Sequence, residues 1–188
     1  NLIDGLEIND INKVIVGDIT YYMADRKWHY IISLKDIYSQ FIVGLEVSQN
    51  QDANAALLCL KAVEKLRGKE NLKGCIHHSD NGSQYNSTEY KKLLKELGMQ
   101  ISRAENCMQN GSSEQFHGII KNMYFEPWGV VTYQEMQLAK PRFLHLNNYE
   151  RAIAQLGNMS PGTFENELKK IPLELRIKKQ LHDFKKQN

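Results

Sequence analysis

The alternation of apolar and polar positions predicts strands first and helices later. Three short runs rich in apolar and β-branched residues come first, at positions 14–19, 30–34 and 40–47. Turn-forming residues at 25–27 and 36–39 separate them, so each connection is short. Short connections favour antiparallel neighbours, and we expect a meander of three strands.

Helical spacing begins after this meander. Asp52 is a typical N-cap, apolar residues repeat every three or four positions from Ala53 to Val63, and Gly68 is a stop signal. Further on, Thr132 and Glu135 have the spacing of a capping box, which predicts a final helix running towards position 147. Between these helices the pattern predicts strands at 74–78 and 99–102 and helices at 87–97 and from 112 onwards. The expected fold class is therefore α/β, a ribonuclease-H-like mixed five-stranded sheet flanked by helices.

Three acidic residues stand where this arrangement can bring them together. Asp18 and Asp80 end two apolar runs, and Glu114 opens a helical stretch. Carboxylates gathered at one edge of a sheet repel each other unless hard cations such as Mg²⁺ lie among them. The pattern indicates a two-metal phosphoryl-transfer site.

Composition narrows the class of protein. The 188 residues, 41% of them hydrophobic, include no apolar run long enough for a membrane span and no signal peptide, so we expect a soluble globular protein without a membrane partner. Three cysteines without Cys-x-x-Cys spacing favour a reducing cytoplasm.

Charge is divided unevenly along the chain. The net charge is +2, but residues 169–188 carry +5 and the remainder −3. A basic end behind a slightly acidic body suits a protein that contacts phosphate backbones along certain faces. Lys178 and Lys179 in this end are candidate DNA contacts, although a solvated terminal helix explains them equally well.

Several motifs in order carry a family resemblance. Residues 78–85, HSDNGSQY, resemble the H-S-D-x-G-x-Q-Y signature of bacterial insertion-sequence transposases whose catalytic core is related to retroviral integrase. Further similarities to that family are DITY at 18–21, DIYS at 36–39, Asn106-Cys107 and Asn110 followed by Glu114 and Phe116, and the closing Arg151, Leu156, Gly157 and Pro161. The resemblance implies an integrase-like catalytic core at 1–165 and a basic C-terminal tail at 166–188.

The resemblance also implies a chemistry. Asp18, Asp80 and Glu114 fall on that family's metal ligands, which hold two Mg²⁺ or Mn²⁺ ions, nick transposon ends and join them to target DNA. The implied partners are DNA and further copies of the chain, assembled as a homo-multimer on bacterial nucleoid DNA, with no small-molecule substrate.

Other residues receive less direct roles. Lys121 lies two helical turns after Glu114, on the same side, and the family places a basic DNA contact there. Gln84 either contacts DNA or braces the loop after Asp80, and Arg151 is a further DNA candidate. A structural role is expected for both His77 and His78. His117 lies one turn after Glu114 and could approach a phosphate or metal, but a helix-surface or packing role is expected.

Departures from the family pattern leave alternatives open. Gln40 stands where an arginine is usual, Gln109 where an aspartate is usual, and Ala152-Ile153 where Pro-His is usual. The alternative to an active transposase is a catalytically impaired or domesticated integrase-fold module that binds DNA or protein. A ribonuclease-H-type nuclease is a weaker third reading. Since little sequence precedes Asp18, we also expect the regions that recognise specific DNA ends to lie elsewhere.

Overall fold

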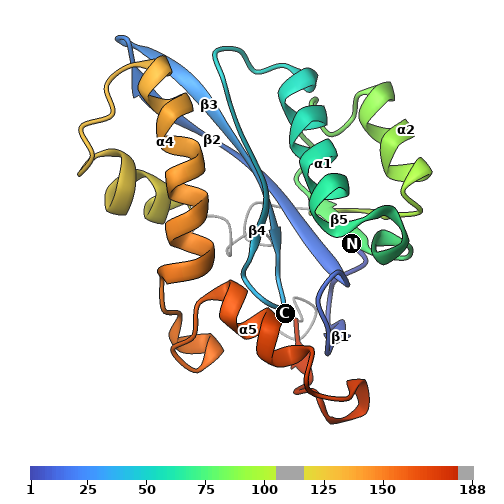
Figure 1. Ribbon diagram of the computed structural model, residues 1–188. Coiled ribbons are helices and arrows are strands. Elements are labelled where there is room, and N and C mark those ends of the chain that lie inside the picture. The colour runs from blue at the N-terminus through green and yellow to red at the C-terminus, as the bar shows by residue number, and fades with distance from the viewer. Residues whose placement is uncertain (105–116, 182–188) are drawn as a thin grey trace, which may run out of the picture.

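The computed structural model describes residues 1–104 and 117–181, in which a central sheet has helices on both faces (Figure 1). The strands of these residues are β1 (Glu7–Ile8), β2 (Val14–Ala24), β3 (Lys27–Asp36), β4 (Ile42–Ser48), β5 (Ile76–Ser79), β6 (Gln100–Arg103) and β7 (Lys179–Gln180). The α-helices are α1 (Ala53–Arg67), α2 (Thr88–Glu96), α4 (Tyr133–His145) and α5 (Pro161–Leu168), joined by two π-helices, η3 (Ile119–Phe125) and η4 (Leu146–Glu150), and by the 3₁₀ turns η1 (Lys69–Leu72), η5 (Ala154–Leu156) and η6 (Leu173–Leu175). No helix within the described ranges is both long and apolar enough to cross a membrane.

The predicted mixed sheet is confirmed. Over the described residues its five strands run in the order β4-β3-β2-β5-β6, with β2, β3 and β4 antiparallel and β5 and β6 parallel to β2. The β2–β3 hairpin turns through Asp25 and Arg26, both with positive φ (51° and 58°), as a tight two-residue hairpin turn requires. The strand β2 is longer than the predicted run because Tyr22 and Ala24 stay buried while Tyr21 and Met23 are exposed.

Each face of the sheet has its own hydrophobic cluster. The helices α1 and α2 cover one face, where Ile15, Ile32 and Leu34 pack against Leu60 and Leu94. The other face is covered by η3 and α4, whose buried aromatic residues pack against alternate residues of β3 and β4. Neighbouring strand residues point to opposite faces of the sheet, so only side chains on the same face as Asp18 can contact it.

Two predicted helix starts are confirmed, whereas the start predicted at position 112 lies outside the described residues. Asp52 caps α1 by accepting a hydrogen bond from the Ala55 amide, and Thr132 and Glu135 form the complete capping box of α4. The expectation that the helix beginning at Thr132 is the last one is wrong, because α5 follows it. Ser160 as N-cap and Pro161 in the first turn are the sequence signals for α5.

The predicted C-terminal tail lies partly against the body of the protein. The strand β7 pairs antiparallel with β1, and Leu181 is buried in a third cluster with Val14 and Val16. The negative charges of the body offset part of the basic charge here, since Arg176 pairs with Asp10.

Candidate active site

Two of the expected metal ligands belong to neighbouring parallel strands, but only Asp80 follows a strand end. The expectation that Asp18 ends its run is wrong, because β2 continues past it to Ala24. Gly17 of β2 is the register partner of Ser79 of β5, so the next pair in register is Asp18 and Asp80. Asp18 is 9% exposed, whereas Asp80 is exposed in the loop after β5. The parallel pairing of β2 with β5 therefore brings the residue after Ser79 level with Asp18, while Glu114 lies outside the described residues.

A histidine that the sequence analysis set aside contacts the first carboxylate. His117 Nε2 lies 2.6 Å from Asp18 Oδ2, and both side chains are largely shielded from solvent. The expected surface or packing role for His117 is therefore wrong. The available signal was the spacing, because His117 follows Glu114 by almost one helical turn.

Lys121 lies one turn beyond His117. Its Nζ is 5.3 Å from the centre of the Tyr21 ring, a cation–π distance. Partial burial lowers the pKa of Lys121, and the negative charges of Glu126 and Asp18 oppose that shift. Lys121 is thus a cation close to the acidic residues, as its predicted DNA-contacting role requires.

The loop after β5 is held by short polar contacts. Asp80 Oδ1 accepts a hydrogen bond from the Gly82 amide at 3.0 Å, and a Cβ on Gly82 would stand 3.0 Å from both Asp80 Oδ1 and Gln84 Oε1. Gln84 itself is only 2% exposed. A side chain so buried cannot reach a DNA backbone in this structure, so of its two expected roles the geometry supports bracing the loop and not DNA contact.

His77 and His78 have the expected structural role. His77 Nε2 is 2.7 Å from the Tyr90 hydroxyl, and His78 Nδ1 is 2.9 Å from Ser102 Oγ. Burial lowers the pKa of His77 to about 3 and that of His78 to about 4, so both rings are neutral near pH 7. The same crowding explains why position 17 is a glycine, because a Cβ there would stand 3.1 Å from His77 Nε2.

The remaining basic candidates lie in different surroundings. Arg151 follows η4 and lines a cavity, with Nη1 3.4 Å from Asn147 Oδ1. Lys178 is exposed and pairs with Glu7 at 2.8 Å. Lys179 donates to the Ile37 carbonyl at 3.0 Å and is partly buried, which lowers its pKa. Of these three, Lys178 is the exposed residue, and Arg151 and Lys179 are both half-buried.

Asp18 and Asp80 are chemically suited to bind a divalent metal ion. Asp18 and Asp80 offer carboxylate oxygens, the ligands preferred by Mg²⁺ and Mn²⁺. In the parts of the chain that the structure describes, no group of three or more potential ligands is gathered at one point. The described residues therefore do not supply a third metal ligand.

Comparisons with known proteins agree with this geometry. The family model described as Integrase core domain matches residues 9–106, more than half of the chain. The transposase for insertion sequence element IS904 of Lactococcus lactis is 31% identical over 162 residues, which cover 82% of this chain and 61% of that protein. The insertion element IS600 uncharacterized 31 kDa protein of Shigella sonnei is 28% identical over 163 residues, 83% of this chain and 58% of its own length. The chain thus spans about three fifths of these two relatives.

A solved structure shares the architecture. The HTLV-2 integrase catalytic core domain in complex with magnesium superposes with a TM-score of 0.65 at 16% identity, over 82% of this chain and 96% of that one. At this identity the likeness shows the fold, which is ribonuclease-H-like. The match over residues 9–106, with the sheet order and the parallel pairing of β2 and β5, shows that this chain belongs to the integrase core domain family.

Proposed function

We propose that this chain is the catalytic core of a DNA transposase, a polynucleotidyl transferase of the D-D-E type that nicks transposon ends and transfers them into target DNA. The observation that carries the proposal is the parallel register of β2 and β5, in which Gly17 and Ser79, the residues before Asp18 and Asp80, are partners. Membership of the integrase core domain family and the similarity to the insertion-sequence transposase of Lactococcus lactis support the same reaction.

Asp18, Asp80 and Glu114 would hold two Mg²⁺ or Mn²⁺ ions. Such ions, when bound, stabilise the entering and leaving oxygens of an in-line phosphoryl transfer. The chain itself orients the ligands: His117 fixes one oxygen of Asp18 at 2.6 Å, and the Gly82 amide fixes one oxygen of Asp80 at 3.0 Å. Lys121 lies close enough to Asp18 to feel its charge, and a cation there can bind a DNA phosphate.

DNA is the proposed partner on two counts, as transposon end and as target. Lys121, Arg151 and Lys178 are the basic residues that we assign to its backbone. We further propose that the protein acts as a homo-multimer on nucleoid DNA in the bacterial cytoplasm. A related fold supports assembly on DNA, since a structure titled as a simian T-cell lymphotropic virus intasome superposes with a TM-score of 0.68 at 17% identity.

The test is strand cleavage and joining on an oligonucleotide carrying the element's end, with Mg²⁺ or Mn²⁺. We expect metal-dependent nicking that Asp80→Asn abolishes. The matched control is Asp52→Asn, which makes the same change at the exposed N-cap of α1, where asparagine caps equally well. Tight DNA binding without cleavage by the unaltered chain would refute the proposal and support the impaired or domesticated module instead.

A further inference from the structure

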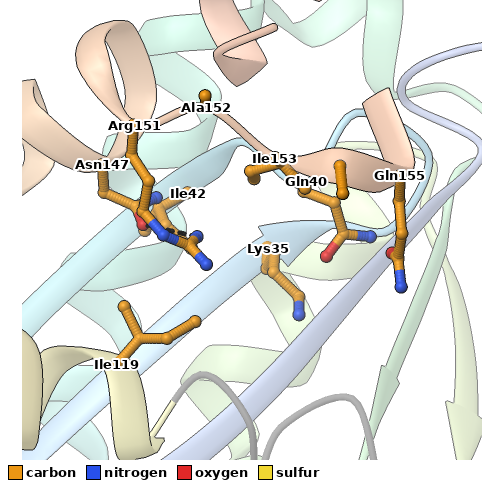
Figure 2. A pocket seen from close by; sticks show the side chains of 10 residues that line it. Lys35, Gln40, Ile42, Ile119, Asn147, Arg151, Ala152, Ile153 and Gln155 are labelled. Atoms are coloured by element: carbon orange, nitrogen blue, oxygen red, sulfur yellow. Dashed lines mark hydrogen bonds between the residues drawn. The ribbon is translucent and has the colours of Figure 1, made fainter. Parts of the chain in front are cut away.

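A cavity of about 230 Å³ lies between the β3–β4 side of the sheet and the segment that follows η4 (Figure 2). Its walls come from β3, the β3–β4 turn, β4, η3, and the chain from Asn147 to Gln155. Lys35 Nζ and the side-chain amides of Gln40 and Gln155 point into this space, and the Arg151 guanidinium borders it from above (Figure 2). The groups that face the cavity are therefore cations and amides.

Several positive charges lie close together at the cavity. Lys35 is 8% exposed, on a strand in the middle of the protein. Its pKa is lowered to about 8, first by burial, then by the positive charge of Lys179 and also by that of Arg151, while Asp18 acts in the opposite direction. A phosphate oxygen that enters the cavity would meet the Lys35 ammonium inside it and the Arg151 guanidinium at its border, and both groups form charge-assisted hydrogen bonds to phosphate.

The cavity adjoins the candidate active site. Lys35 is the register partner of Val16, and Ser33 is the register partner of Asp18, so Lys35 and Asp18 occupy diagonal positions on the same face of the sheet. Ile119, another wall residue, belongs to the helix that follows His117. A strand of DNA held at Asp18 and Asp80 would carry its next phosphates along this face, since phosphates repeat about every 3.4 Å of helix axis per strand.

We propose that this cavity binds one phosphate of the DNA backbone, a neighbour of the phosphate held at Asp18 and Asp80, through Lys35 and Arg151 with the amides of Gln40 and Gln155. The proposal rests on the proposed function, because it assumes that the acidic pair faces DNA. It assigns a binding role to Lys35, Gln40 and Gln155. The chemical class of the ligand is a phosphodiester with a single negative charge.

The first test pairs a protein change with a DNA change. All binding is measured on the Asp80→Asn background, so that no cleavage is needed for the readout. A set of oligonucleotides carries a neutral methylphosphonate at one backbone position at a time. We expect one position near the cleavage site where this replacement weakens binding about tenfold, as loss of a charge-assisted contact does, and where it changes little once Lys35→Gln is present. Equal effects at every position in both proteins would overturn the proposal.

The second test is the dependence of binding on salt. Lys35→Gln removes one phosphate contact, so the slope of log affinity against log salt should fall by about one. The matched control is Lys61→Gln, at an exposed position of α1 on the opposite face of the sheet, which should leave the slope unchanged. If both changes reduce the slope equally, the effect is one of general charge and the proposal fails.

A third measurement separates binding from folding. Lys35→Met removes the charge of this buried side chain while keeping most of its apolar volume, so it should weaken DNA binding in a protein that circular dichroism shows to be folded. A folded Lys35→Met protein that binds DNA as tightly as the unaltered chain would overturn the proposal. A fourth measurement adds inorganic phosphate at constant ionic strength. Stabilisation of the unaltered chain by phosphate, without any sensitive methylphosphonate position, would indicate a free-anion site and overturn the DNA proposal.

None of these measurements uses strand transfer. An inactive enzyme with a sensitive methylphosphonate position would therefore refute the proposed function and leave the phosphate site standing.

Discussion

The pair formed by Arg67 and Glu165 allows a sharp test of how the closing segment is held. Arg67 Nη1 and Nη2 donate to the two carboxylate oxygens of Glu165 at 2.7 and 2.6 Å, and Ser39 Oγ donates to the same carboxylate at 2.6 Å. Arg67 ends α1, Ser39 lies in the β3–β4 turn, and Glu165 belongs to α5. One carboxylate thus ties α5 to both the first helix and the sheet.

The expected cost of Glu165→Gln follows from burial. The side chains of Arg67 and Glu165 are only 9% and 8% exposed. Replacing the carboxylate by an amide of the same shape leaves the guanidinium charge buried without its partner, which typically costs about 3–5 kcal/mol. Glu167 on the same helix pairs with Lys170 at 2.7 Å, but those side chains are 48% and 69% exposed. For Glu167→Gln we expect a loss of about 1 kcal/mol or less.

Urea unfolding followed by far-ultraviolet circular dichroism, near neutral pH, measures both free energies of unfolding. We expect a clearly lower midpoint for Glu165→Gln at an unchanged slope, and a midpoint close to that of the unaltered chain for Glu167→Gln. The two changes are chemically identical and lie two positions apart on one helix. A difference between them of less than about 1 kcal/mol would refute the reasoning that burial makes this pair important.

Three further predictions concern the sites and the core. Mg²⁺ or Mn²⁺ should raise the melting temperature, because ions bound only by the folded state relieve carboxylate repulsion, and an equal rise in the Asp18→Asn/Asp80→Asn variant would contradict a shared ion site. His77 is held neutral by burial, with a pKa lowered from 6.5 to about 3, so its contribution to stability is complete above pH 6.5 and is lost as the pH falls from there towards 3, by up to about 1.4 kcal/mol per pH unit. Unfolding midpoints measured across that range should therefore fall less steeply for His77→Gln, and identical slopes would show that the ring is not buried neutral. Gly44→Ala should lower the free energy of unfolding by about 1–3 kcal/mol, because the new Cβ would stand 2.7 Å from a backbone carbonyl of α1, whereas at Gly118 nothing lies within 4 Å and the same change should do no harm.

The sequence by itself determined the order and type of most elements and two of the acidic positions. Period-two burial in the strands and three-four spacing in α1 and α2 are local properties, and the Thr132–Glu135 capping box is a contact within one turn. The motif around Asp80 likewise depends on neighbours along the chain. Such features can be predicted because their physical causes act over a few residues. The short helix α5 was missed since eight residues carry little periodicity of their own.

The tertiary structure alone decided which distant groups meet. Spacing relates His117 to Glu114 along the chain, but no local pattern pairs it with Asp18, buries Gln84, or sets Lys35 among other cations beside a cavity. Each of these facts depends on strand register and on the face to which a side chain points, and a shift of one residue would reverse every such assignment. Register depends on how the whole sheet packs between its helices. The surroundings of Asp18 and Asp80 can therefore be determined only from the folded structure.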